Sequence, residues 1–315
     1  KPLYALNFPD YFKLLMVSAT SKFDKIISYV LPLEIEVSLS RYIFTLNHLM
    51  QQKVDKVARL VCDTESFNPQ VFVNEALQTS SSLVPNFSKI SPTEQSLGLM
   101  FFFRVIFDRA YEFNPLAFFT NNRNNDQEKL FKLGKLAIKH FQIPTGYKPE
   151  ESSIPIRNFF LNDHFFHESS LFLDQTNYIT NPIDAIYYIH KALNLINKAA
   201  ILRNVGKLAE PTIRDITYLL CFDDQFSLLI GVLLASDIPN FFQFADFIVN
   251  FSPEKYLCNS FQYALSAVKA LSTYITDFDF IPYENEIQTT ESNNEDVSIE
   301  QNHNEINSNE VSVVN

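Results

Sequence analysis

Apolar residues recur at three- and four-residue spacing along most of the chain. This spacing places them on one side of a helix, so each run predicts a helix with one face toward the core. The clearest runs are Phe12–Val17, Val37–Leu49, Leu97–Tyr111, Leu130–Phe141, Ala185–Leu202, Ile213–Leu220, Phe226–Leu234 and Phe261–Tyr274. The 315 residues include five glycines, whereas all-β folds need many at their turns. The pattern therefore predicts an all-α fold.

Helix starts and loops divide these runs. Ser91-Pro92-Thr93-Glu94 combines a capping serine, a proline in the first turn and an acid, and Asn181-Pro182-Ile183-Asp184 repeats the arrangement. Glu210-Pro211-Thr212 is a weaker example. Two stretches, Thr120–Asp126 and Gly146–Pro155, are polar or rich in Pro and Ser and predict loops.

The second loop suggests a domain boundary. We expect an N-terminal helical region at 1–145, a second helical domain at 146–283, and a tail at 284–315. The tail is rich in Asn, Glu and Ser and contains eight acids and no Lys or Arg. Such a segment buries too little apolar surface to offset the entropy of ordering it. We therefore predict a disordered acidic tail.

The charge distribution limits the partners. The net charge is −11, but without the tail 28 acids face 25 bases. This near-neutral body predicts neither nucleic-acid binding nor a polybasic membrane patch. No run of about 18 apolar residues predicts an integral membrane segment. The three cysteines stand far apart in apolar runs, which predicts buried free thiols in a reducing, cytoplasmic environment.

Three blocks in the last third carry the most specific pattern. The first is Pro182–Ile189 (PIDAIYYI), and the second is Asp223–Leu234 (DDQFSLLIGVLL) followed by Ser236–Phe241 (SDIPNF). The third is Tyr256–Val268 (YLCNSFQYALSAV). In this order and approximate spacing, they resemble the VPS-nine (vacuolar protein sorting) domain family.

The chain departs from the family at one position in each block. Ala185 stands where the family has Lys, Ser227 where it has Pro, and Asn259 where it has Thr.

The resemblance implies a multi-helix bundle of VPS-nine type. It also implies a guanine-nucleotide exchange factor that promotes GDP release from an early-endosomal Rab-family GTPase, with peripheral recruitment to the endosomal surface as an option. By residue matching, Asp223 is the acidic finger and Tyr256 supports it on the third-block helix. Expected GTPase contacts are Asp224, Phe226, Ser227, Ile230, Asn259 and Phe261, with Phe226, Ile230 and Phe261 lining an apolar groove.

Simpler roles compete with these. Asp223 at a helix start is often only an N-cap, Asp224 a first-turn dipole residue, and Tyr256 a half-buried aromatic. Ser227 and Asn259 favour a catalytically weak helical scaffold that binds a GTPase or another partner. His164 and His167 lie three apart without a third ligand, so we expect no metal site. We likewise expect no cofactor, and no motif for nucleotide binding or covalent catalysis occurs.

Overall fold

A computed structural model describes residues 7–21, 33–119, 124–205, 220–238 and 240–283. Over these ranges the secondary structure is α-helix and short 3-10 helix without a strand, which confirms the all-α prediction. The α-helices are α1 (Phe8–Ser21), α2 (Leu33–Leu46), α3 (His48–Ala58), α4 (Pro69–Leu83), α5 (Pro92–Phe113), α6 (Asn124–Lys135), α7 (Ile156–Asn162), α8 (His167–Asp174), α9 (Pro182–Val205), α10 (Phe222–Ala235), α11 (Phe241–Phe251) and α12 (Asn259–Asp277).

The chain forms two compact units, each built from separate stretches of sequence. Unit one takes the described residues of Lys1–Arg123, Leu171–Leu195 and Ile238–Ser272. Unit two takes those of Asn124–Ser170, Ile196–Asp237 and Thr273–Asn315. Helices α9 and α12 therefore contribute to both units. None of the helices in the described ranges has the length and apolar character needed to cross a membrane.

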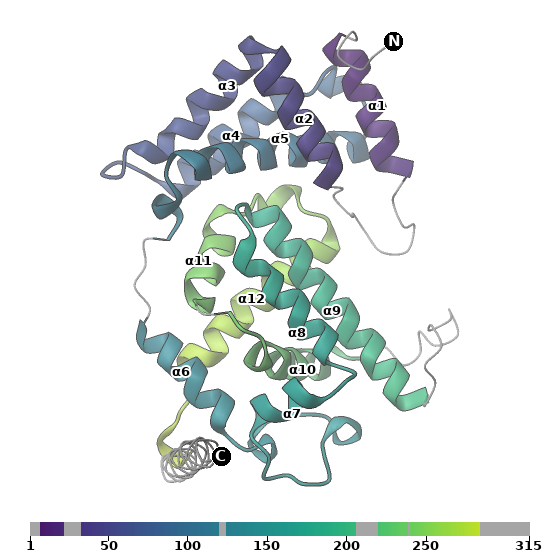
Figure 1. Cartoon of the computed structure of the whole chain (residues 1–315), viewed down its shortest axis with the longest axis vertical. Coiled ribbons are helices and arrows are strands. Elements are labelled where there is room, and N and C mark those ends of the chain that lie inside the picture. Colours follow the sequence, from purple (N-terminus) through teal and green to yellow (C-terminus); the bar gives the residue numbers. More distant parts are fainter. Residues whose placement is uncertain (1–6, 22–32, 120–123, 206–219, 239, 284–315) are drawn as a thin grey trace, which may run out of the picture. The chain divides into compact units, whose positions relative to one another are not determined.

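In unit one, α5 is the helix around which the others pack. Helices α1, α2, α3 and α4 all contact it (Figure 1). Helix α11 contacts α4. Four phenylalanines of α5 are completely buried: Phe101, Phe102, Phe103 and Phe107. The helix begins in a capping box, because Ser91 Oγ accepts from the Glu94 backbone amide and the Glu94 carboxylate accepts from the Ser91 amide.

In unit two, α10 packs against α7 and α6. Every residue from Leu228 to Ala235 is buried, so the second half of α10 is enclosed. The close approach to α7 depends on Gly231, because a Cβ atom there would overlap the ring of Phe160.

Several element boundaries differ from the sequence predictions. The run Val37–Leu49 is two helices, because the side chain of Asn47 caps α3 by accepting from the Met50 amide at 3.2 Å. The run Leu130–Phe141 leaves the α-helix at Lys135. The loop predicted at Thr120–Asp126 is wrong for Asn124 onward, which begins α6. Helices α4, α7, α8 and α11 were not predicted.

Other predictions are confirmed or lie outside the described residues. Asn181 caps α9, since its side-chain oxygen accepts from the Asp184 amide at 3.0 Å. Gly146–Pro155 is irregular apart from a 3-10 turn at its start. The helix predicted at Ile213–Leu220 (apart from its last residue), the start at Glu210-Pro211-Thr212 and the tail 284–315 lie outside the described ranges.

We predict that Gly231→Ala destabilises the protein by about 1–3 kcal/mol, because the added methyl group must displace the Phe160 ring or separate α10 from α7. Gly134→Ala is the matched control: its Cβ atom would lie at an ordinary 3.4 Å from Arg157 Cβ. Alanine there, in the last turn of α6, should be neutral or stabilise by up to about 1 kcal/mol. Urea unfolding measures both, and equal effects would contradict the packing argument.

Candidate functional site

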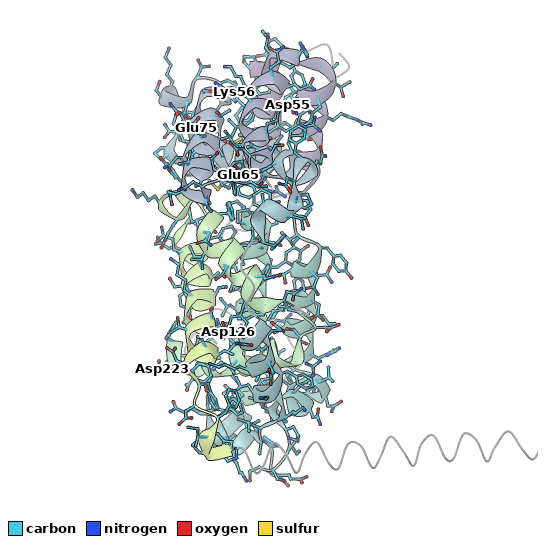
Figure 2. All side chains as sticks on the ribbon, turned by 90° about the vertical axis from the view of Figure 1, so that its left-hand side faces the viewer. Asp55, Lys56, Glu65, Glu75, Asp126 and Asp223 are labelled. Carbon is cyan, nitrogen blue, oxygen red and sulfur yellow. The ribbon has the colours of Figure 1, made fainter. Side chains whose placement is uncertain are left out.

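The start of α10 presents a carboxylate on the surface of unit two. Cys221 is the N-cap, and its Sγ atom accepts from the Asp224 amide at 3.5 Å. Asp223 and Asp224 occupy the first turn, where the positive end of the helix stabilises negative charge. Asp224 is half-buried, whereas Asp223 is exposed at the outer surface (Figure 2). The interpretation of Asp223 as an N-cap is therefore wrong.

Aromatic rings lie beside this carboxylate. Phe222 is 49% exposed, and its ring lies nearly parallel to Phe226 with centroids 5.9 Å apart. Phe226 in turn meets Tyr274 of α12 edge-on at 6.0 Å. Sequence reasoning missed Phe222 and Tyr274, although a phenylalanine in the polar first turn of a helix is itself a signal of an exposed apolar contact. The first turn of α10 thus combines one exposed acid, Asp223, with an accessible aromatic surface.

The remaining second-block residues lie deeper. Ser227 is half-buried. Ile230 is only 4% exposed and belongs to the core of unit two, so in this conformation it lies behind the surface rather than on a groove.

Tyr256 lies on a short turn of unit one. It is the last residue of the 3-10 helix Glu254–Tyr256, between α11 and α12. Tyr256 was predicted to lie on the helix of the third block; this is wrong, because α12 begins three residues later. The Gln262 side-chain amide donates to the carbonyls of Leu257 at 3.0 Å and Glu254 at 3.3 Å. An ion pair of 3.1 Å joins Glu254 to Lys269 on α12. These contacts hold the turn and leave Tyr256 46% exposed.

Two cavities of unit one share Tyr256 in their lining. One, of about 200 Å³, is lined by Leu97 and Met100 of α5 and by Phe261 of α12. The other is a wide hollow of about 820 Å³ along α4 and the end of α11. Phe261 is 3% exposed and Asn259 is exposed at the first position of α12. Sequence reasoning missed the residues of α4 and α5, which lie more than 150 positions before Tyr256 in the chain.

A buried histidine lies behind Phe261. His190 of α9 is 7% exposed, and its ring centroid is 5.7 Å from that of Phe261. The amide nitrogen of Asn194 lies 2.9 Å from His190 Nε2. Burial, and to a lesser extent the charge of Lys191, lowers the pKa of His190 from 6.5 to about 4. The imidazole is therefore neutral at pH 7.

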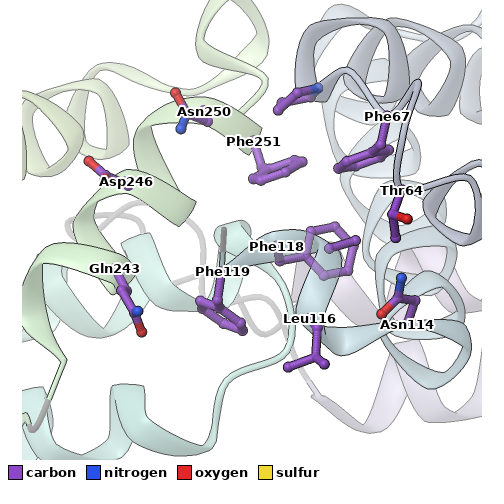
Figure 3. Close-up of a pocket in the computed structure, with 12 residues that line it drawn as sticks. Thr64, Phe67, Asn114, Leu116, Phe118, Phe119, Gln243, Asp246, Asn250 and Phe251 are labelled. Atoms are coloured by element: carbon purple, nitrogen blue, oxygen red, sulfur yellow. The ribbon is translucent and has the colours of Figure 1, made fainter. Parts of the chain in front are cut away.

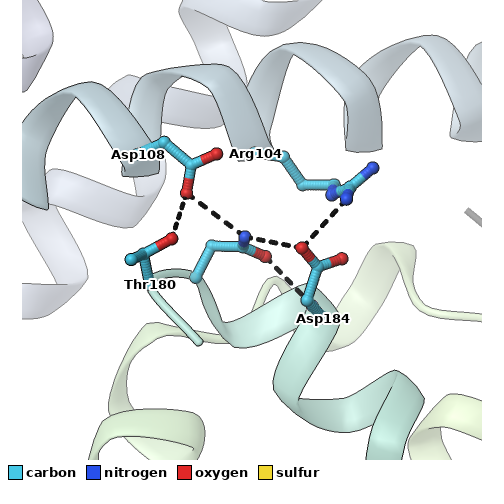
Figure 4. Close-up of polar contacts among 5 residues, drawn as sticks. Arg104, Asp108, Thr180 and Asp184 are labelled. Atoms are coloured by element: carbon cyan, nitrogen blue, oxygen red, sulfur yellow. Dashed lines mark hydrogen bonds and ion pairs between the residues drawn. The ribbon is translucent and has the colours of Figure 1, made fainter. Parts of the chain in front are cut away.

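The first block anchors α9 to α5 through a polar network (Figure 4). Arg104, with a side chain 1% exposed, forms a 2.9 Å ion pair with Asp184, whose side chain is 15% exposed. Asn181 donates to the carboxylates of Asp184 at 2.9 Å and Asp108 at 3.3 Å. Thr180 donates to Asp108 at 2.5 Å. Asp184 is thus a structural anchor.

The burial of residue 185 explains why this chain has an alanine where the VPS-nine family has a lysine. Ala185 is completely buried. A lysine there would have to place its aliphatic chain and charge in the packed interface of α9, at a considerable cost in free energy.

The prediction of buried thiols is wrong for Cys62 and Cys221, which are exposed, and Cys258 is half-buried; none of the three forms a disulfide. The apolar neighbours of Cys221 misled the prediction, because the thiol caps a helix at the surface. Among the described residues, His164 and His167 included, no group of three His, Cys, Asp or Glu side chains is placed to hold a metal ion.

The predicted site residues divide between the two units. The α10 residues Asp223, Asp224, Phe226, Ser227 and Ile230 belong to unit two, and Tyr256, Asn259 and Phe261 belong to unit one. Within each unit the members lie close together in sequence and in space. No family model and no curated protein matches the chain. Functional assignment therefore depends on the site chemistry and the three blocks.

We predict that Arg104→Met lowers the free energy of unfolding by about 3–5 kcal/mol, because it leaves the Asp184 carboxylate without its buried partner. Lys269→Met breaks an exposed ion pair, with side chains 40% and 58% exposed, and is the control; we expect a loss of no more than about 1 kcal/mol. Denaturant unfolding compares them. Equal losses would show that the Arg104 pair does not anchor the fold.

We also predict an acid-sensitive contribution from His190. Between pH 6.5 and about 4 the unfolded chain binds a proton that the folded chain excludes. The free energy of unfolding should therefore decrease as the pH is lowered through this window, and His190 should account for up to roughly 3 kcal/mol of the decrease. Between pH 7 and 4, the free energy of unfolding of His190→Gln should depend less steeply on pH than that of the native protein. Parallel curves for the variant and the native protein would contradict the assignment.

Proposed function

We propose that this protein is a guanine-nucleotide exchange factor for a Rab-family small GTPase of the early endosome. The observation that carries the proposal is the exposed Asp223 carboxylate in the first turn of α10, beside the exposed ring of Phe222. The three sequence blocks that resemble the VPS-nine family support it, since this carboxylate opens the second block.

The chemistry requires no covalent step. A small GTPase holds GDP through a magnesium ion and through backbone amides and a lysine around the phosphates. A carboxylate inserted beside the phosphates repels them, competes for the magnesium ion and pairs with the lysine as the nucleotide leaves. Asp223 is suited to this role because its side chain is exposed in the first turn of α10. Phe222 and Phe226 offer an apolar surface to the GTPase.

Tyr256 is proposed as a second contact on the same GTPase. Its turn is held by Gln262 and Glu254, and its exposed ring borders a cavity with apolar walls. A tyrosine whose turn is held in place and whose side chain is 46% exposed suits a partner surface that is apolar with a polar edge. The recruitment of the protein to the endosomal surface would follow from its GTPase partner.

A scaffold that binds the GTPase without exchange remains the competing function. Ser227 and Asn259 favour it, because they replace the residues that the family has at the start of α10 and near the start of α12. Both alternatives predict binding, so only the rate of nucleotide release separates them.

We predict that Asp223→Asn slows GDP release from the cognate Rab by roughly 10- to 150-fold, because one charge-assisted contact worth about 1.5–3 kcal/mol is lost in the transition state. Asp237→Asn, exposed just beyond the other end of α10, is the control and should retain full activity, while Asp224→Asn, half-buried in the same turn, should have a smaller effect than Asp223→Asn. Release of fluorescent GDP from a panel of Rab GTPases measures all three.

Each outcome of this assay has a definite meaning. Binding of a Rab by the native protein without accelerated release would favour the scaffold. Full exchange activity in Asp223→Asn together with lost activity in Asp224→Asn would show that Asp224, and not Asp223, is the acidic finger.

A further inference from the structure

Unit one contains a third cavity, which none of the three blocks lines. It has a volume of about 240 Å³ and lies among the segment before α4, the turn Pro115–Phe118 after α5, and α11 (Figure 3). The proposed exchange function assigns it no role.

Four phenylalanines are among the residues that line this cavity. Phe251 of α11 stacks on Phe67 with centroids 6.0 Å apart and meets Phe118 edge-on at 5.0 Å. Phe119 lines the same space. An apolar cavity of about 150 Å³ is enough to bind benzene. The present cavity therefore has room for an aromatic ring with a short attached chain.

Leu116 extends this apolar surface to the outside. It lies in the lining of the cavity and is 77% exposed. Its exposure means that it contributes little to the packing of the folded chain. A leucine in this position is suited to cover one face of a ligand that enters the cavity.

The polar part of the lining is neutral except for one acid. Three carboxamides, from Asn114, Gln243 and Asn250, line the cavity together with the Thr64 hydroxyl and Asp246. The Asn114 side chain is held in place, because its Nδ2 atom donates to the Val61 carbonyl at 2.8 Å. No Lys, Arg or His occurs among the described lining residues. Phosphates and carboxylates therefore lack a cationic partner here.

We propose that this cavity binds an aromatic side chain of a partner peptide, with the ring against the phenylalanine walls. A carboxamide both donates and accepts hydrogen bonds, as a peptide group does, so the amides of Asn114, Gln243 and Asn250 match the backbone on either side of that aromatic residue. The site is a docking point for a partner protein and does not depend on exchange activity.

The test uses the full-length chain and three small probes. N-acetyl-phenylalanine N-methylamide carries the ring and two peptide groups, benzyl alcohol carries the ring without them, and phenylacetate carries a ring and a negative charge. Saturation-transfer NMR titrations give the affinity of each. We expect the phenylalanine probe to bind most tightly and phenylacetate most weakly.

Two substitutions at exposed positions locate the binding. Asn250→Trp fills the mouth of the cavity, and Leu116→Ser removes its apolar edge. Each substitution should weaken the binding of the phenylalanine probe by roughly tenfold or more. Val249→Trp is the matched control, because Val249 is exposed and adjacent to Asn250 but does not line this cavity. This variant should bind the phenylalanine probe as tightly as the native protein does. Thermal unfolding confirms that the variants are folded.

Three results would overturn the proposal. They are no saturation transfer to the phenylalanine probe, unchanged binding in both cavity variants, and equally tight binding of benzyl alcohol. The last result would indicate a site for free aromatic molecules rather than for a peptide.

Discussion

The buried ion pair between Arg104 and Asp184 is the interaction on which the arrangement of unit one depends. A guanidinium that is 1% exposed has lost its hydration, so the fold must provide it with a carboxylate. Asp184 meets that requirement from the first turn of α9, and the Asn181 side chain joins it to Asp108 on α5. This contact fixes α9 against α5. Helix α9 in turn places His190 behind Phe261, while α5 supplies Leu97 and Met100 to the cavity beside Tyr256.

In unit two, packing determines which end of α10 is presented to a partner. The eight residues from Leu228 to Ala235 are enclosed, and Gly231 lets the helix approach Phe160 closely. Within α10, the fully exposed residues lie in the first turn. That turn carries Asp223 and Phe222, and the helix end itself favours a carboxylate there. The acid is thus held by a rigid helix rather than by a loop, which suits a residue that must enter the nucleotide site of another protein.

The sequence predicted the elements whose cause is local. Long amphipathic runs became α5, α9, α10 and α12, and the capping side chains of Ser91 and Asn181 were recognised from neighbouring residues. It did not predict what depends on distant partners. Arg104 and Asp184 are 80 positions apart, and α7 and α8 are too short to show a clear period. Cys221 was misjudged because an apolar neighbourhood indicates burial, whereas its thiol caps a helix at the surface. A helix start at Asp223 was predicted, but the exposed ring of Phe222 beside it was not.

If the first turn of α10 enters the nucleotide site of a GTPase, the thiol next to that turn must become covered in the complex. Cys221 is exposed and caps α10, and Cys62 is exposed in a segment that none of the three blocks includes. Alkylation of the two thiols, followed by mass spectrometry with and without nucleotide-free Rab, measures this directly. We expect Cys221 to be protected in the complex while Cys62 reacts as in the free protein. Unchanged reactivity of Cys221 in a stable complex would contradict the proposed role of α10.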